Sequence, residues 1–502
     1  MAALLTSPKL HAADREEAPM SWLGPIPPIR HERHFDGRVV RTYAERPRTF
    51  NGMLADAVAR NPAGEAIVSE TGRLSYRDLG VIVARIAGGL SGLGIAKGDR
   101  VAIIASNVSE VVLILMATMR LGAVAVLLSP RESQPALSYM LNHSGAEALV
   151  YEPAFAGLVP DPQATPELRT RIIIGAAGTG EVSVSQLAAA DPVPEAAVAE
   201  EDTAVILYTS GTTGRPKGAM ITHLGLVHAA MIYQTCMALT AEDRSVVVVP
   251  MSHVTALTAG IGAMVRAAGT LIISSAFKAD DFVRLAAAER MTHTVMVPAM
   301  YNLILMSPAL AGADLSHWRI GGYGGAPMPE VTIRRLAERV PDLKLMNAYG
   351  STETTGPVVL MPPSETASRR TSVGRAVPVT ELLVMDDDAN EVAAGETGEI
   401  WLRAPNVVVG YWRDPAATAE SFVAGYWRSG DLGSVDGDGY LTLLDRKKDM
   451  INRGGYKIFS VEVENALAAH PSVVEAAVVA KPCPVLGERV HAFVVARSGE
   501  PV

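Results

Sequence analysis

The run 208–218 (YTSGTTGRPKG) has the residue types of a loop that binds phosphates. It holds three glycines, one proline and four Ser or Thr hydroxyls, and Lys217 stands near its end. This composition suits neither a helix nor a regular strand, so we predict an open loop with outward-facing backbone N–H groups. Those amides, the hydroxyls and the Lys217 ammonium could bind the oxygens of a polyphosphate. The spacing differs from the usual P-loop, and a polar surface turn is the alternative.

The same run resembles the phosphate-binding signature of the adenylate-forming superfamily, which includes acyl- and aryl-CoA synthetases, peptide-synthetase adenylation domains and luciferases. The resemblance covers about residues 50 to 500, with five signatures in order. It implies an enzyme that uses ATP and Mg²⁺. The implied ATP- or AMP-binding residues are Thr209, Ser210, Gly211, Thr212, Thr213, Gly214, Lys217, Gly325, Ala326, Pro327, Asn347, Ala348, Tyr349, Gly350, Ser351, Thr352, Asp431 and Arg446.

A second run, 347–354 (NAYGSTET), resembles the Y-G-x-T-E signature of that family. The flat ring of Tyr349 could lie against adenine, and the Asn347 amide could bind the edge of the base. Thr352 offers a hydroxyl to the α-phosphate. Glu353 offers a carboxylate to Mg²⁺, a cation that prefers oxygen ligands. For this run taken alone, a polar loop is the alternative.

Two shorter runs resemble further parts of the nucleotide site. The glycine string 321–327 (GGYGGAP) would let backbone lie against a flat ring or an acyl chain, because glycine has no side chain to collide. In the run 426–431 (YWRSGD), the Asp431 carboxylate can accept two hydrogen bonds from ribose hydroxyls. The alternative for Asp431 is an ordinary surface residue in a turn at the end of a strand.

The segment 250–253 (PMSH) resembles the entrance of the acyl pocket in that family, although a lone histidine is often structural. With it, the implied catalytic set is Lys217, Thr352, Glu353 and His253. Most candidate pocket residues are apolar or small, and none is an arginine that could bind a second carboxylate. We therefore expect an aromatic or medium-length apolar monocarboxylic acid. The candidate pocket residues are His253, Thr255, Ala256, Met300, Tyr301, Tyr323, Gly324, Gly350, Ser351 and Thr355.

The charged run 445–449 (DRKKD) resembles the hinge between the two domains of the family. By position, Arg446 would contact ribose or phosphate, and the small domain would rotate about Lys448. Arg453, Gly454 and Gly455 would lie beside the pantetheine arm of coenzyme A. A solvated basic patch is the alternative for these residues.

One family element has no match in the sequence. The family carries a lysine in a P-x-x-x-x-G-K-like segment near its C-terminus, where it contacts the carboxylate and the α-phosphate during adenylation. Lys457 and Lys481 stand in other contexts. We therefore expect the 502-residue chain to adenylate slowly and a longer natural chain to be competent.

The apolar pattern predicts an α/β fold around these runs. Helices and strands alternate from residue 50 to about 273, which favours a largely parallel sheet covered by helices. Short strands separated by turns after residue 380 predict a β-rich subdomain. The predicted division is an irregular N-terminal extension over 1–45, a large domain of mixed sheets and helices over 46–444 with its β-rich part at about 380–444, and a hinge with an incomplete small α+β domain over 445–502.

Composition limits the alternatives. The chain is 49% hydrophobic and carries a formal net charge of −9, which argues against a nucleic-acid partner. It has two cysteines, Cys236 and Cys483, too few for a disulfide framework, which favours a reducing, cytoplasmic location. The apolar stretch 111–128 is interrupted by Arg120, so no transmembrane segment is expected. A homodimer is left open.

These observations favour a two-step enzyme. A carboxylate would attack the α-phosphate of Mg·ATP to give an acyl-adenylate and pyrophosphate, and the thiol of coenzyme A would then displace AMP. Two other functions stay open: an adenylation domain that loads a carrier protein, and a non-catalytic adenylate-binding protein, which the missing lysine would fit.

Overall fold

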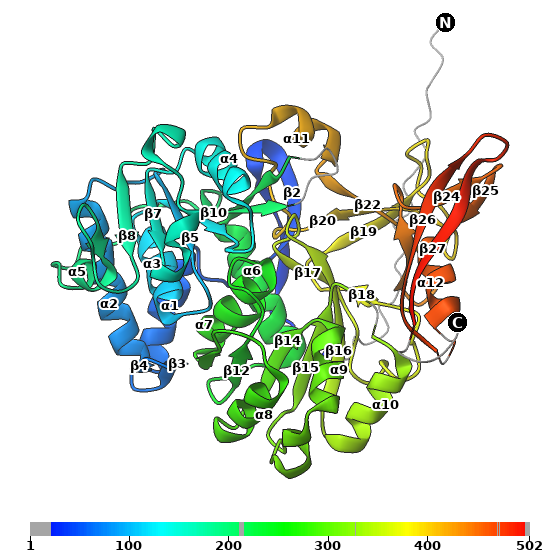
Figure 1. The fold of residues 1–502 in the computed structure, drawn as a ribbon, viewed down its shortest axis with the longest axis horizontal. Coiled ribbons are helices and arrows are strands. Elements are labelled where there is room, and N and C mark those ends of the chain that lie inside the picture. The colour runs from blue at the N-terminus through cyan, green and yellow to red at the C-terminus, as the bar shows by residue number, and fades with distance from the viewer. Residues whose placement is uncertain (1–21, 210–214, 327, 469, 471, 497–502) are drawn as a thin grey trace, which may run out of the picture.

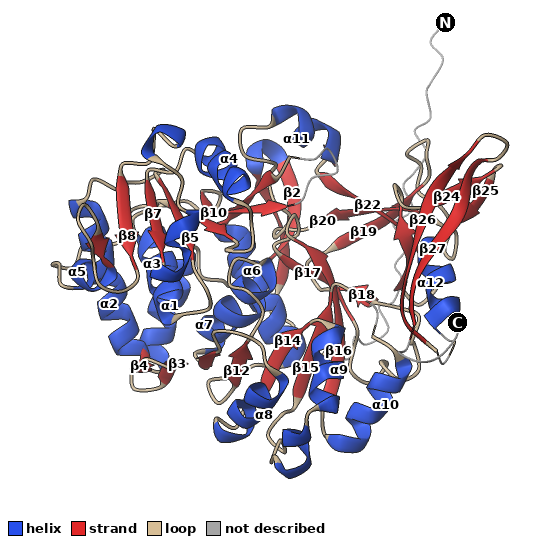
Figure 2. Cartoon of the chain, viewed as in Figure 1, coloured by secondary structure: helices blue, strands red, loops and turns tan. Residues whose placement is uncertain are grey.

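Two large β-sheets share one apolar core. The structure, a computed structural model, describes residues 22–209, 215–326, 328–468, 470 and 472–496. Figure 1 shows the chain passing from the first sheet (cyan) to the second (green to yellow), with a short C-terminal sheet (orange to red) at one side. Figure 2 shows helices packed against both large sheets.

The first sheet has seven strands in the order β11-β10-β6-β5-β7-β8-β9. Its neighbours are parallel except β10 and β11, which pair antiparallel. Every residue of β6 is buried, as expected of an apolar run inside a parallel sheet. The bounds are β5 Arg100–Ile104, β6 Val124–Leu128, β7 Ala148–Tyr151, β8 Thr170–Ile173, β9 Val182–Ser183, β10 Thr203–Thr209 and β11 Lys217–Thr222.

The second sheet has 14 strands and runs β19-β20-β22-β23-β18-β17-β16-β15-β14-β12-β13-β3-β4, with β21 beside β22. The predicted β-rich part is thus continuous with this sheet through β18 and β17. The bounds are β3 Glu65–Ser69, β4 Gly72–Ser75, β12 Arg244–Val247, β13 Thr270–Ile273, β14 His293–Met296, β15 Ile320–Gly324, β16 Lys344–Ser351, β17 Gly356–Leu360, β18 Gly374–Ala376, β19 Glu381–Met385, β20 Gly398–Arg403, β21 Phe422–Val423, β22 Tyr426–Val435 and β23 Tyr440–Arg446.

Helices between the two sheets form the shared core. α3 and α6 are apolar almost all round, which explains why nearly all their residues are buried. A π-helix, η4, continues directly into α7. The helices of this core are α1 Phe50–Arg60, α2 Tyr76–Gly92, α3 Ser109–Arg120, α5 Val184–Ala188, α6 His223–Met237, η4 Ala256–Gly262 and α7 Ala263–Ala267.

Other helices cover the outer faces. α8 Ala279–Ala288, α9 Pro298–Met306 and α10 Glu330–Arg339 pack on the far face of the second sheet around Trp318, and α4 Gln134–Ser144 covers the first sheet. The remaining short elements are α11 Pro415–Ser421 and the 3-10 helices η1 Phe35–Gly37, η2 Pro153–Leu158, η3 Pro162–Ala164 and η5 Pro308–Gly312.

The C-terminal part is a four-stranded sheet, β25-β24-β27-β26, with one helix against it. Its elements are β24 Ile451–Arg453, β25 Tyr456–Ile458, α12 Ser460–Ala468, β26 Val473–Cys483 and β27 Gly487–Ala496. Asp445 accepts hydrogen bonds from the backbone N–H of Ser460, the first residue of this helix, and from its hydroxyl at 3.1 Å. A residue of the expected hinge therefore holds the N-terminus of α12.

The N-terminal segment differs from expectation. Residues 29–43, predicted to be irregular, form an antiparallel hairpin of β1 Ile29–His34 and β2 Arg38–Tyr43. The sequence does not indicate this hairpin, because prolines and charges precede Ile29. Its strands also need no strong apolar alternation, since distant contacts fix them. Backbone of the hairpin reaches the core at α6, where His228 Nε2 accepts the N–H of Tyr43 at 3.2 Å.

The ends of the run 208–218 are also more regular than expected. Tyr208 and Thr209 belong to β10, and Lys217 and Gly218 belong to β11, with Thr209 paired to Lys217. The predicted open loop is therefore confined to the residues between these strands, of which 210–214 lie outside the described residues. Among the helices that the structure describes, none is both long and apolar enough to cross a membrane.

Candidate active site

Lys217 lies at the start of β11, directly after the expected phosphate loop. Its ammonium is 5.1 Å from the centroid of the Tyr411 ring. Within the described ranges it forms no ion pair with a carboxylate. A half-buried ammonium over an aromatic face, without a protein anion, is free to bind an anionic ligand. Ser210, Gly211, Thr212, Thr213 and Gly214 lie outside the described residues, so their phosphate contacts stay a prediction.

Glu353 lies in the turn that follows β16 and is 9% exposed. The Tyr411 hydroxyl donates to its Oε1 at 2.9 Å. No lysine, arginine or histidine of the described chain pairs with this carboxylate. Buried carboxylates are normally paired with a cation or bound to a metal, so this one fits Mg²⁺, with the half-buried Thr352 next to it in the chain.

The segment 406–412 joins these two groups, and the sequence analysis missed it. Asn406 Nδ2 donates to the carbonyl of Thr354 at 2.7 Å, and the Val408 N–H donates to the carbonyl of Glu353 at 2.8 Å. On the other side, the Trp412 N–H donates to the carbonyl of Gly218 at 2.7 Å. No spacing pattern reveals this segment, because its role depends on the pairing of distant strands.

Tyr349 and Asp431 meet across the site. The Tyr349 hydroxyl donates to Asp431 Oδ2 at 2.6 Å, and Arg446 Nε lies 3.4 Å from Asp431 Oδ1. Burial raises the pKa of Asp431, while the Tyr349 hydrogen bond and the Arg446 charge oppose the rise. The predicted adenine-binding ring, the ribose acceptor and the hinge arginine thus lie side by side.

The glycine string runs along the same edge. β15 pairs with β16 in parallel, with Tyr323 opposite Asn347 and Gly324 opposite Ala348. A Cβ at Gly324 would stand 2.4 Å from the Ala348 carbonyl oxygen, so only glycine allows this approach. Gly325 and Ala326 follow in an exposed turn, and Pro327 lies outside the described residues.

The candidate acyl-pocket residues are divided between the two faces of the second sheet. Ala256 belongs to the shared core. Tyr301 and Tyr323 lie on the opposite face; Tyr301 is fully buried, stacks on Trp318 and donates to the carbonyl of Gly322 at 2.8 Å. Tyr301 and Tyr323 therefore pack in a different apolar cluster from Ala256, and their place in one acyl pocket stays a prediction. Met300 contacts both cores.

His253 lies beyond β12 and is exposed. Its Nδ1 accepts the N–H of Thr255 at 3.2 Å, and partial loss of hydration lowers its pKa, so the ring is neutral near pH 7 with its proton on Nε2. Asn107, a second residue that the sequence analysis missed, holds this segment. Its side chain donates to the carbonyl of Val249 and accepts the N–H of Met251.

Strain and unpartnered hydroxyls lie on either side of Glu353. Thr355 has φ +51°, a left-handed conformation that a β-branched residue rarely adopts. The buried hydroxyl oxygens of Ser351 and Thr355 have no hydrogen-bond partner among the described residues. Gly350, just before them, is exposed. A cavity of about 10 Å³ beside Thr255 and Ala256 is no larger than one water.

Arg446 apart, the expected pivot Lys448 and the expected coenzyme A residues take no part in these contacts. Lys448 is exposed in the turn after β23. Arg453 ends β24, and Gly454 (φ +61°) and Gly455 (φ +93°) form the turn into β25. In the described chain, the backbone bonds of this turn go to Leu486 and Asn452. The structure does not bring it to the nucleotide residues.

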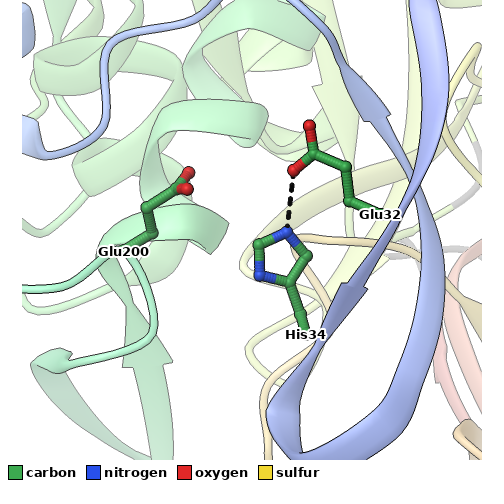
Figure 3. Close-up of side chains that lie close together, drawn as sticks. All are labelled: Glu32, His34 and Glu200. Atoms are coloured by element: carbon green, nitrogen blue, oxygen red, sulfur yellow. Dashed lines mark hydrogen bonds and ion pairs between the residues drawn. The ribbon is translucent and has the colours of Figure 1, made fainter.

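A separate cluster has the ligand types of a metal site. Glu32, His34 and Glu200 place ligand atoms within 4.8 Å of one another, and Figure 3 shows Glu32 and His34 on one strand facing Glu200. Arg46, whose side chain is fully buried, binds Glu32 at 2.6 Å and Glu200 at 2.8 Å. The guanidinium already supplies the positive charge, so this cluster anchors the N-terminal hairpin.

Comparison with known proteins places the nucleotide residues in a family. The family model for AMP-binding enzymes matches residues 54–412, and that for the AMP-binding enzyme C-terminal domain matches residues 462–502. The first match spans Lys217, Glu353 and Tyr411 and more than half of the chain. The protein therefore belongs to the AMP-binding enzyme family.

Several relatives are CoA ligases by name. The chain is 37% identical to a feruloyl-CoA synthase of Amycolatopsis sp over 85% of its length and 84% of that protein. It is 35% identical to the long-chain-fatty-acid–CoA ligase FadD13 of Mycobacterium tuberculosis over 90% of each chain. The structure of the o-succinylbenzoate coenzyme A synthetase of Bacillus subtilis with ATP and magnesium ion superposes with a TM-score of 0.79, at 26% identity over 90% of each chain.

Proposed function

We propose that this protein is an AMP-forming ligase that joins a carboxylic acid to coenzyme A. In the first step, a carboxylate oxygen attacks the α-phosphorus of ATP, the bond to the bridging oxygen breaks, and pyrophosphate leaves. In the second, the sulfur of coenzyme A attacks the acyl carbon, AMP leaves with the bonding electrons, and the thiol loses its proton. The observation that carries this proposal is Glu353, a buried carboxylate without a protein cation, facing the same tyrosine as Lys217.

In the first step the residues of the chain act mainly by positioning and charge. Lys217 would hold ATP phosphate oxygens, and Tyr349 and Asp431 would hold adenine and ribose. Glu353 would hold Mg²⁺, which neutralises phosphate charge when bound, and the Thr352 hydroxyl would bind the α-phosphate. Fixing the nucleotide in this way converts the attack by the acid into a reaction between oriented partners.

For the second step we propose a rotation of the small C-terminal part about Lys448, with the division between domains at residue 445. Lys448 has the features of a pivot, since it is exposed in a short turn between β23 and β24. Rotation would carry Arg453, Gly454 and Gly455 toward the acyl-adenylate. Domain rotations of this kind are a recognised way to separate two chemical steps.

The acid is proposed to be an apolar monocarboxylate, either aromatic or of medium chain length. The candidate pocket residues include Thr255, Ala256, Gly324 and Thr355, none of which carries charge. The π-helix η4 begins at one of them, Ala256, and such helices are frequent at functional sites. The acyl groups named for the two relatives, feruloyl and long-chain fatty acyl, are one aromatic and one aliphatic, and neither carries a second carboxylate.

Two assays test the function. The first measures pyrophosphate release from ATP and Mg²⁺ by the full-length protein with cinnamates, benzoates and medium-chain fatty acids, and with dicarboxylates as controls. The second supplies a synthetic acyl-adenylate and measures thioester formed with coenzyme A, so it does not depend on the rate of adenylation. We expect release with apolar monocarboxylates and a coenzyme A thioester.

Other outcomes would replace the proposal. An acyl-adenylate that binds but reacts with no thiol would indicate a non-catalytic binder. Transfer to a carrier protein without transfer to coenzyme A would indicate a loading domain. Release with dicarboxylates alone would reject the apolar acid while leaving the ligase function in place.

A further inference from the structure

Tyr411 is a buried residue that contacts both charged groups of the proposed phosphate site. Its side chain is 6% exposed. Its hydroxyl donates to Glu353 Oε1, and its ring lies under the ammonium of Lys217. We propose that Tyr411 is a positioning residue that orients Glu353 for Mg²⁺ and keeps Lys217 from pairing with it. The inference rests on the proposed function, because it assumes that a magnesium nucleotide binds here.

The carboxylate is fixed at one end only. The Val408 N–H binds the Glu353 carbonyl, and Asn406 binds the next carbonyl along, so the backbone of the turn is held. The Tyr411 hydroxyl then fixes Oε1, while Oε2 makes no hydrogen bond with the described residues. A carboxylate held through one oxygen presents the other in a defined direction. Residues that orient metal ligands in this way commonly set metal affinity.

The strand of Lys217 is held by the same short segment. Ala219 pairs with Tyr411, the Met220 N–H donates to the Gly410 carbonyl at 3.1 Å, and the Trp412 N–H donates to Gly218. Backbone on both sides of Tyr411 therefore fixes the distance between β11 and the turn that carries Glu353. Any shift of this segment would move both charges together.

The ring also separates opposite charges. An ammonium and a carboxylate that face one small space would form an ion pair, and each would then be neutralised before a ligand arrives. Tyr411 offers its ring face to Lys217 and its hydroxyl to Glu353, so both charges are stabilised without meeting. No ion pair joins Lys217 and Glu353.

If Tyr411 had only a structural role, its replacement would lower stability without a specific effect on metal binding. The Tyr411 ring also packs edge-on against Phe422, with centroids 5.8 Å apart, so any truncation could lower stability. Tyr76 supplies the matched control. It is 1% exposed, and its hydroxyl donates to the carbonyls of Met264 and Gly269, away from Glu353 and Lys217. Tyr76→Phe removes an equally buried hydroxyl without touching the proposed site.

The test measures metal binding rather than turnover. Mn²⁺ replaces Mg²⁺, and its binding to the protein with α,β-methylene-ATP, which cannot release pyrophosphate, is followed by electron paramagnetic resonance. We expect Tyr411→Phe to weaken Mn²⁺ binding about tenfold and Tyr76→Phe to leave it unchanged. In a Glu353→Gln background, Tyr411→Phe should have no further effect, because it acts through that carboxylate. Tyr411→Leu also removes the ring, so binding of the ATP analogue in the absence of metal should weaken about threefold.

The result that overturns the inference is Mn²⁺ affinity within about twofold of wild type in Tyr411→Phe, with a melting temperature lowered as in Tyr76→Phe. If Tyr411→Phe does not fold, Glu353→Asp keeps the charge but draws it away from the hydroxyl, and unchanged Mn²⁺ binding there would equally reject the idea. The proposed function fails separately, when wild type binds Mn²⁺ and the analogue but activates no acid.

Discussion

Two groups of carboxylates in this molecule have opposite electrostatic settings. The half-buried Glu32 and Glu200 lie on either side of the fully buried Arg46, and hydrogen bonds from Arg46 hold the pKa of Glu32 well below its usual range. The buried Glu353 accepts a hydrogen bond from a tyrosine hydroxyl and pairs with no cation among the described residues. The first group resembles a metal site by the spacing of its ligand atoms, yet it is already neutralised. The second has a single carboxylate, yet it is the one that lacks a positive charge.

The difference shows how a structural cluster can be separated from a functional one. Ligand atoms gathered in space are common wherever an arginine is buried, because its guanidinium attracts carboxylates. A buried carboxylate without a partner is expensive, and folding alone does not explain it. A buried carboxylate that lacks a cation is therefore a better indicator of a binding site than the number of metal-ligating side chains that lie close together.

The largest expected effect is the loss of the Arg46 charge. Arg46→Met would leave the half-buried Glu32 and Glu200 without the cation that they share. Of the described arginines, only the exposed Arg30 and Arg48 would still pair with them, and we expect the free energy of unfolding to fall by about 3 kcal/mol. Urea denaturation measures it. The control is Arg73→Met: Arg73 also pairs with two glutamates, Glu65 and Glu289, but is half exposed, so its loss should cost less than about 1 kcal/mol. Equal losses of unfolding free energy in the two variants would contradict the proposed difference between the Arg46 cluster and the more exposed Arg73 cluster.

The next effect concerns catalysis rather than stability. Glu353→Gln should slow acid-dependent pyrophosphate release about a hundredfold, or about 2.7 kcal/mol in barrier, because Mg²⁺ loses a carboxylate ligand. Its free energy of unfolding should not fall, since no protein cation is left unpaired. Glu399→Gln is the contrast: Glu399 is also buried but binds Arg428 and Lys447, so that variant should unfold more easily. Release within threefold of wild type in Glu353→Gln would reject the magnesium assignment.

The sequence indicated candidate site residues more readily than the residues that contact them. Lys217, Glu353 and Asp431 were proposed because each stands in a short run whose glycines, hydroxyls and charges fit one ligand. Tyr411 and Asn406 were not, because they act across strand pairings formed by residues more than fifty positions apart. The local sequence pattern shows which residue types a segment contains, but not which distant residues it will contact in the fold.

The same limit explains one error in the fold. The hairpin 29–43 is held by Arg46 and His228, contacts that local apolar alternation does not indicate. Local pattern also does not indicate that Ala256 and Tyr301 belong to different apolar clusters. By contrast, the alternating helices and strands before residue 273 were predictable, since each carries a continuous apolar run.

A smaller effect should follow loss of the unpaired cation. Lys217→Ala should raise the concentration of ATP needed for half-maximal pyrophosphate release about tenfold, because a phosphate oxygen loses a charge-assisted contact worth about 1.4 kcal/mol. Lys97→Ala is the matched control, because the Lys97 ammonium is paired with a protein anion, Asp202, at 2.8 Å. Unchanged ATP dependence in Lys217→Ala would leave the ammonium without a functional role.

The smallest effect concerns the loss of stability at low pH that the buried histidines near the Glu32–Arg46 pair should cause. His228 packs on Tyr43 beside Arg46 and Glu32, and burial lowers its pKa to about 3; burial also lowers the pKa of His223 to about 4. Between these values and 6.5 the unfolded chain binds more protons than the folded chain. Stability is therefore complete above pH 6.5 and is lost as the pH falls toward the folded pKa values. Each histidine should cost about 1 kcal/mol between pH 6.5 and 5.5.

Urea denaturation across this range measures the slope. His228→Gln should lower stability at pH 7 but flatten the decline, because one of the two buried rings no longer titrates. His31→Gln, at an exposed position on β1, should leave the slope as in wild type. Lowered folded-state pKa values of the two histidines make the decline begin at the unfolded value of 6.5, above the range in which Glu32, whose pKa is lowered by Arg46, would take up a proton. A decline that began only below pH 4.5 would instead assign acid sensitivity to the carboxylates, and the buried imidazoles would then contribute nothing to it.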